Sequence, residues 1–110
     1  MPKEKVLNLA EALKRANEEA LKFSSVEDNG SCNMDSVVIK LSRWKEEDIK
    51  EASELSGVGL SDKLSGLWNG YRFISTEIHG QANRRYKMVE ASKDSLRKDG
   101  YDVCIYYLAD

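Results

Sequence analysis

The amino-acid sequence predicts an α+β fold in which helices cover one face of a four-stranded antiparallel sheet. Residues 3–23 carry apolar side chains at three- and four-residue spacing, which is typical of an amphipathic helix. Short runs rich in β-branched and aromatic residues at 35–41 and 101–108 predict strands, and helical patterns separate the strand-like segments. A chain of 110 residues is expected to form a single domain, 1–110, with an N-terminal helix within 1–23 and an αβ core at 36–108.

The first two helices have distinct sequence signals. Pro2 suits the first position of the helix at 3–23. The polar stretch "SSVEDNGS" is typical of a loop and precedes the strand "DSVVIKL". Ser42 is the expected N-cap of a second helix that ends at Gly57 and carries three acids in its first turn. Its expected apolar stripe consists of Ile49, Ala52 and Leu55.

The segment "KLSGLWNGYRFISTEI" admits two interpretations. Asn69-Gly70 stands between two aromatic residues and favours a β-hairpin with a type I′ turn, which requires positive φ at both central positions. Alternatively, residues 60–68 form a short helix, because leucines recur there at helical spacing. We favour the hairpin.

A third helix is predicted over residues 83–98, with Arg97 and Lys98 in its last turn and Gly100 just beyond. Its inward residues are expected to be Met88, Ala91 and Leu96. After the first helix, the elements read β-α-β-β-α-β, which is the order of the ferredoxin-like fold. Right-handed crossovers then place both later helices on one face of the sheet. The pattern does not determine where the first helix packs.

Strand alternation divides the expected sheet into two faces. The core face is expected to hold Val37, Ile39, Leu41, Ile74, Ile78, Val103 and Ile105. The opposite face is expected to hold Val38, Tyr71, Phe73, Cys104 and Tyr106. Because aromatic side chains gathered on one face commonly mark an interface, Tyr71, Phe73 and Tyr106 predict a homodimer or larger homo-oligomer. The alternative is that the first helix covers this face.

The stretch "GYRFIS" at 70–75 resembles part of the RNP1 strand of RNA-recognition motifs, in which aromatic side chains stack on bases. It departs from that motif at Asn69, Arg72 and Thr76, which replace a basic, a small and an aromatic residue. The expected partner strand "VVIKLS" contains no aromatic residue. RNA binding is therefore an alternative function.

The stretch "HGQANRR" at 79–85 is the candidate ligand site. Arg84 and Arg85 fall at the start of the third helix, where the helix dipole disfavours a cation by about 0.3–1 kcal/mol. A bound anion would offset this cost, with Gly80 allowing close approach of the backbone. The expected ligand-binding residues are His79, Gly80, Gln81, Asn83, Arg84 and Arg85. In the alternative, Asn83 caps the helix and the arginines pair with Glu77, Glu90 or solvent.

No spacing in the sequence predicts catalysis, a metal site or a cofactor. His79 lacks a nucleophile or carboxylate pair at a motif distance, and Cys32 and Cys104 form no C-x-x-C motif. The formal charge of −2 argues against DNA binding, which usually needs a basic surface. No signal peptide or long apolar run is present, so no membrane association and a cytoplasmic location are expected.

Four stretches carry a resemblance to known proteins, namely "GSCNMDS", "LWNGYRFIS", "GQANRR" and "GYDVCIYYLAD". Through them, residues 24–110 resemble small proteins encoded on phages and integrated mobile elements of gut Firmicutes. The resemblance implies an accessory protein that acts by binding, either blocking a host defence protein or sequestering a nucleotide signal. The alternative within this setting is a structural or oligomeric subunit of a mobile element.

Overall fold

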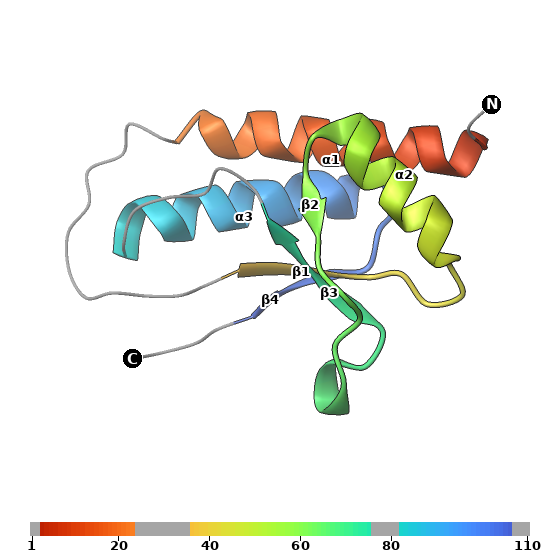
Figure 1. Ribbon diagram of the computed structural model, residues 1–110. Coiled ribbons are helices and arrows are strands. Elements are labelled where there is room, and N and C mark those ends of the chain that lie inside the picture. Colours follow the sequence, from red (N-terminus) through yellow and green to blue (C-terminus); the bar gives the residue numbers. More distant parts are fainter. Residues whose placement is uncertain (1–2, 24–35, 76–81, 107–110) are drawn as a thin grey trace.

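The computed structural model describes residues 3–23, 36–75 and 82–106, with the backbone alone for residues 75 and 82–86. Its elements, in chain order, are α1 (Glu4–Leu21), β1 (Ser36–Lys40), α2 (Glu46–Ser56), β2 (Gly59–Leu60), the 3₁₀ turn η1 (Gly66–Trp68), β3 (Tyr71–Ser75), α3 (Ala82–Lys98) and β4 (Val103–Tyr106). The helices lie on one side of the sheet, and η1 projects from the other side (Figure 1). Within these segments no helix is both long and apolar enough to cross a lipid bilayer.

The sheet has the strand order β2-β3-β1-β4, and every neighbouring pair is antiparallel. The ferredoxin-like arrangement expected from the element order is therefore confirmed. Central strand β1 pairs Val38 with Phe73 of β3 on one side and with Cys104 of β4 on the other. The edge strand β2 is short and joins β3 through Gly59 and Leu60 alone.

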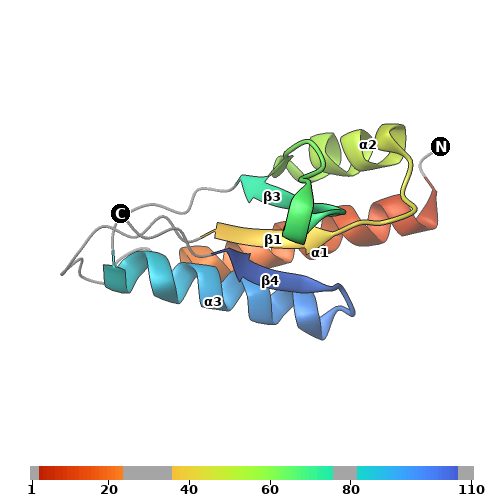
Figure 2. The ribbon, with the colours of Figure 1, turned by 90° about the horizontal axis from the view of Figure 1, so that it is seen from below.

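Helix α1 packs against both α2 and α3, and in Figure 2 it lies behind β1 and between these two helices. Two ionic contacts join it to the neighbouring elements. Lys3, just before α1, pairs with Asp48 of α2 at 3.3 Å, and Arg15, within α1, pairs with Asp99 beyond α3 at 2.5 Å. Its apolar side chains join the hydrophobic core formed by the sheet and the other helices. The interpretation in which α1 covers the aromatic face of the sheet is therefore wrong.

Three local predictions are also wrong. Helix α2 begins at Glu46 rather than after Ser42, because residues 41–44 form a turn in which the Trp44 amide donates to the Leu41 carbonyl. Its end at Gly57 is as predicted, with a left-handed φ of 72°. Leu55 is 45% exposed instead of buried, since the helix presents Ile49 and Ala52 to the core. The third error is the type of turn before β3.

The connection between β2 and β3 combines the two alternatives considered for this segment. The strands pair as a hairpin, but residues 61–70 join them and include the 3₁₀ turn η1. Asn69 has φ −55° and ψ 129°, and Gly70 has φ 89°, which is the geometry of a type II turn rather than type I′. Asn69 therefore adopts an ordinary conformation, and the positive φ falls on the glycine alone.

The predicted faces of the sheet are largely confirmed. Val37, Ile39, Leu41, Ile74 and Val103 are buried on the helix side, and Ile105 packs partly against them. The prediction for Ile78 lies outside the described residues. On α3, Met88 and Leu96 are fully buried, whereas Ala91 is half-buried and Val89 and Ser92 take its place in the core.

Candidate functional site

The candidate functional site is the sheet face opposite the helices, which we call the aromatic face. It is defined by Trp68, Tyr71, Phe73 and Tyr106 around a central Val38. Val38 is completely buried although it points away from the helices, while the four aromatic side chains are half-buried. Side chains therefore already cover the middle of this face, and the aromatic rings form its outer surface.

The rings contact one another in a continuous chain. Phe73 of β3 meets Tyr106 of β4 with ring centres 5.2 Å apart, and the ring of Trp68 lies 5.4 Å from those of both Tyr106 and Tyr71. Such tilted and edge-to-face pairs contribute about 0.5–1.5 kcal/mol each beyond the area they bury. The four rings consequently form one continuous surface rather than a set of separate side chains.

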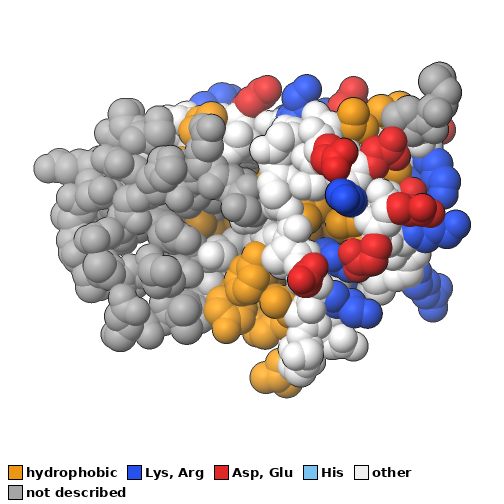
Figure 3. Space-filling view, viewed as in Figure 1, with side chains coloured by type: hydrophobic (Ala, Val, Ile, Leu, Met, Phe, Trp, Pro, Cys, Tyr) orange, Lys and Arg blue, Asp and Glu red, His pale blue; other side chains and the backbone are white. Residues whose placement is uncertain are grey.

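A fully exposed leucine extends the aromatic face. Leu67 precedes Trp68 in η1 and is 100% exposed. The other exposed large apolar side chains among the described residues, Leu7 and Leu55, lie on helices and are 44% and 45% exposed. Figure 3 shows hydrophobic side chains gathered below the described part of the sheet, with a further group projecting beneath them. A protruding leucine beside an aromatic cluster is typical of a surface that another molecule covers.

Charged and polar groups border one end of the aromatic face. The Tyr71 hydroxyl donates to an Asp102 carboxylate oxygen at 3.4 Å and lies 3.9 Å from the Cys104 sulfur. Burial, followed by these two neighbours, raises the pKa of Tyr71 to about 12. The Lys40 ammonium lies 5.8 Å above the centre of the Tyr71 ring. This end of the face thus carries one cation and one anion beside a neutral phenol.

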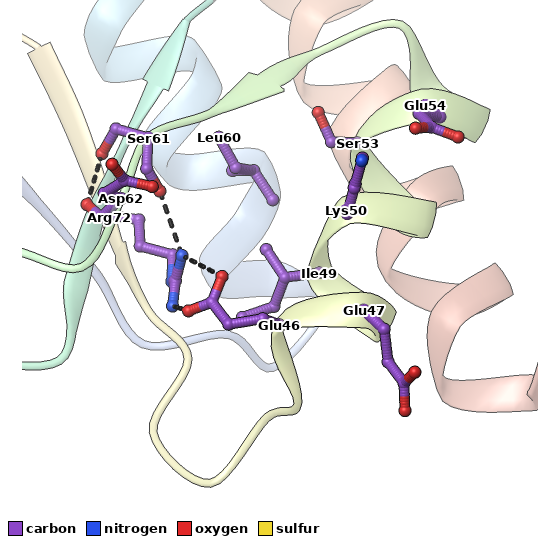
Figure 4. Close-up of a pocket in the computed structure, with 10 residues that line it drawn as sticks. All are labelled: Glu46, Glu47, Ile49, Lys50, Ser53, Glu54, Leu60, Ser61, Asp62 and Arg72. Carbon is purple, nitrogen blue, oxygen red and sulfur yellow. Dashed lines mark hydrogen bonds and ion pairs between the residues drawn. The ribbon is translucent and has the colours of Figure 1, made fainter.

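A second notable group lies at the opposite side of β3, toward α2. Arg72 is 4% exposed and its guanidinium forms a two-pronged ion pair with Glu46, while also donating to the Ser61 carbonyl at 3.1 Å (Figure 4). Its Nε atom has no hydrogen-bond partner among the described residues. Glu46 is 72% exposed, and the hydrogen bond from Arg72 lowers the pKa of this carboxyl group. A buried cation is therefore neutralised by a carboxylate that water reaches.

The hollow drawn in Figure 4 has a volume of about 450 Å³ and lies between α2 and the β2 edge of the sheet. Acidic residues outnumber basic ones in its lining, with Glu46, Glu47, Glu54 and Asp62 against Lys50 and Arg72. Acidic side chains alone do not define a ligand. Within the described segments, no group of three or more histidine, cysteine or acidic residues is placed to hold a metal ion.

The predicted anion site before α3 falls mostly beyond what the structure describes. His79, Gly80 and Gln81 lie outside the described residues. The backbone places Asn83, Arg84 and Arg85 in the first turn of α3, which begins at Ala82, but their side chains are not described. The location of both arginines at the start of a helix is therefore as predicted, and the binding of an anion there stays a prediction.

Sequence reasoning missed three residues that shape these surfaces. The sequence places Trp68 beside a turn and Leu67 in a hairpin or a helix, and it does not indicate that either belongs to a surface cluster. Arg72 occupies a core-facing position by strand alternation, between Tyr71 and Phe73, so the sequence did contain a signal for a buried cation that needs a partner.

Comparison of the chain with protein-family models, with curated proteins and with solved structures found no match in any of the three.

Proposed function

We propose that this protein acts by binding, as a small cytoplasmic accessory protein that antagonises a component of host defence, and that it works as a homodimer joined through the aromatic face. The observation that carries the proposal is the aromatic cluster of Trp68, Tyr71, Phe73 and Tyr106, continued by the fully exposed Leu67. Aromatic side chains are enriched in the cores of protein interfaces, where they contribute much of the binding energy.

The charges beside the cluster suit a symmetric dimer. In a two-fold interface the same patch meets itself, so each positive group needs a negative group within that patch. Lys40 and Asp102 lie side by side at one end of the aromatic face, where the Lys40 amide donates to the Asp102 carbonyl at 2.9 Å. In the proposed dimer, Lys40 of one chain pairs with Asp102 of the partner subunit at the rim of the interface.

The biological part of the proposal follows from the resemblance to proteins of phages and mobile elements. Small proteins in that setting act by blocking a host protein or by sequestering a signal molecule. An aromatic surface whose rings already contact one another in the single chain suits the first of these actions, because less side-chain entropy is lost on binding. The aromatic face then binds either a second copy of this chain or the host protein, which replaces that second copy.

RNA binding is the rival use of the aromatic face, and the sheet gives it less support. Proteins that stack bases on a sheet use aromatic side chains on both central strands. Here β3 supplies Tyr71 and Phe73, but β1 presents Val38 and Lys40 on this face. We therefore expect a protein partner and treat RNA as an outcome that the experiment distinguishes.

The proposal is tested by sedimentation velocity of wild type and of Phe73→Ala at micromolar concentration. Wild type should sediment as a dimer, and Phe73→Ala should shift toward monomer because loss of an aromatic from an interface core costs about 2 kcal/mol or more. Leu55→Ala is the matched control, since Leu55 is an exposed apolar residue on the helix side. Circular dichroism establishes that each variant is folded.

A monomeric wild-type protein contradicts the proposed dimer. Equal shifts for Phe73→Ala and Leu55→Ala contradict the assignment of the interface to the aromatic face. Fluorescence anisotropy with a single-stranded RNA oligonucleotide provides the second arm. If wild type binds the RNA and Phe73→Ala does not, the face is an RNA-binding surface and the protein-binding proposal fails.

A further inference from the structure

From a cationic hollow beside the Arg72–Glu46 pair, we infer a second binding site that takes a phosphoryl group of a small molecule. The hollow has a volume of about 510 Å³ and lies between the β1–α2 connection and the turn before β3. This volume is in the range of small-molecule sites, which is about 300–1,000 Å³. Of the described residues that line it, none belongs to the predicted anion site at 79–85, and Arg43, Lys63 and Arg72 lie outside the aromatic face.

The charge of this hollow is opposite to that of the whole chain. The residues that line it include Arg43, Lys63 and Arg72, with a single acidic residue, Glu46. Lys40 also lines it, although its ammonium lies over the Tyr71 ring on the aromatic face. Among the described residues, no carboxylate lies within ion-pair distance of Lys40, Arg43 or Lys63. In a protein with a formal charge of −2, such a local excess of positive charge attracts anions.

Arg72 gives the hollow a fixed, buried cation. Its side chain is 5% exposed, and the orphaned Nε atom leaves one of its donors free of any partner among the described residues. Buried donors usually have partners, so a free one beside a polar hollow indicates a missing acceptor. The guanidinium of arginine matches the geometry of phosphoryl oxygens, which accept hydrogen bonds from two of its nitrogens.

Glu46 occupies the place of a competing anion. Its carboxylate is 72% exposed and accepts hydrogen bonds from both terminal nitrogens of Arg72. These hydrogen bonds, and to a smaller extent the charge of nearby Lys63, lower its pKa. A phosphoryl group with about two negative charges satisfies more of the cations than this single carboxylate does. The ligand therefore competes with Glu46 for Arg72 and is held by Arg43 and Lys63 at the open side.

The backbone around the hollow is held in position. The Leu41 amide donates to the Gly70 carbonyl at 3.1 Å, which joins the end of β1 to the turn. A Cβ atom at Gly70 would lie 3.7 Å from the Lys40 side chain and from the Ser42 hydroxyl, so both side chains pack close against the turn. These contacts hold the β1–α2 connection against the turn before β3, which are the two backbone segments that border the hollow.

The experiment is isothermal titration calorimetry at fixed ionic strength with inorganic phosphate, pyrophosphate, adenosine monophosphate and succinate. Phosphate or pyrophosphate should bind wild type, and succinate should bind more weakly. Arg43→Ala and Lys63→Ala should each weaken binding by about tenfold, which is the loss of one charge-assisted contact. Both residues are exposed, so these variants are expected to fold normally.

Two further variants make the test specific. Glu46→Gln should tighten binding by roughly threefold or more, because it removes a negative charge that opposes the ligand. Lys50→Ala is the matched control, since Lys50 lines the neighbouring acidic hollow and should have no effect. Comparison of adenosine monophosphate with inorganic phosphate distinguishes a nucleotide from the phosphoryl group alone, and either result supports the site.

Several outcomes would overturn the inference. They are absence of binding by every phosphoryl compound, succinate binding as tight as phosphate, equal losses in Lys50→Ala and Lys63→Ala, or weaker binding by Glu46→Gln. Loss of binding in Arg84→Ala but not in Arg43→Ala would assign the anion to the start of α3 instead.

Discussion

Replacing Leu67 by serine should weaken self-association without destabilising the folded chain. Leu67 is 100% exposed, so its side chain makes no buried contact in the monomer. Surface substitutions of this kind usually change the free energy of unfolding by less than about 0.5 kcal/mol. Leu67 therefore separates dimer stability from the stability of the single chain. Phe73 and Tyr106 do not, because they contribute both to the fold and to the proposed interface.

The expected loss of dimer stability follows from the burial of the Leu67 side chain in the interface. Complete burial of a leucine side chain contributes about 1.5–3 kcal/mol. A two-fold interface contains the residue twice, so Leu67→Ser should cost the dimer about 3–6 kcal/mol if both copies become buried. Since 1.4 kcal/mol corresponds to a factor of ten, the dissociation constant should rise by on the order of a hundredfold or more.

The assay is sedimentation equilibrium over a concentration series, combined with urea unfolding at a protein concentration below the wild-type dissociation constant. Leu7→Ser is the control, because Leu7 is an exposed leucine on α1, 44% accessible. An unchanged dissociation constant for Leu67→Ser, or an equal change in Leu7→Ser, would refute the reasoning. A loss of monomer stability above about 1 kcal/mol would show instead that Leu67 belongs to the folded core.

Three further results are expected. The pKa of Glu46 is lowered by its hydrogen bond from Arg72, so this pairing stabilises the fold above the ordinary pKa of 4.5, and the stabilisation is lost as pH falls through the folded-state pKa. Urea unfolding should therefore show a weaker loss of stability in acid for Glu46→Gln than for wild type. Because the pKa of Tyr71 is raised from 10.0 to about 12, stability should decrease as pH rises through that interval. This decrease should be smaller in Tyr71→Phe, in which Tyr101 still has a raised pKa, as followed by unfolding and by tyrosinate absorbance. If the start of α3 binds an anion, that anion at a hundredfold excess over its Kd should add about 2.7 kcal/mol to wild-type stability, and the gain should be smaller at high salt. Arg84→Ala and Arg85→Ala should show no rise in melting temperature with any nucleotide or phosphate tested.

The sequence predicts the sheet well because its signals are local. Alternation along β1 and β3 separates Ile39 and Ile74 from Val38 and Phe73, and the register across the strands then brings the outward residues into one face. The C-terminal end of α2 is equally local, since Gly57 supplies the left-handed conformation that stops a helix.

The remaining features depend on partners that are distant in sequence. The start of α2 is fixed by the turn at residues 41–44 rather than by a capping side chain, and α1 is located by its contacts with α2 and α3. Arg72 stands in a strand where its charge argues against burial, and its acidic partner lies 26 residues earlier in the chain. Trp68 reaches the aromatic face through a type II turn, which the Asn-Gly pattern alone does not distinguish from a hairpin turn.

Native mass spectrometry of the freshly purified protein tests the central claim, that the aromatic face joins two copies of this chain. The predicted result is a species of twice the 12.5 kDa chain mass at micromolar concentration, which gives way to the single-chain mass in Leu67→Ser. The same spectrum reports any small molecule that the protein retains. A wild-type protein found only at the mass of one chain would contradict the claim.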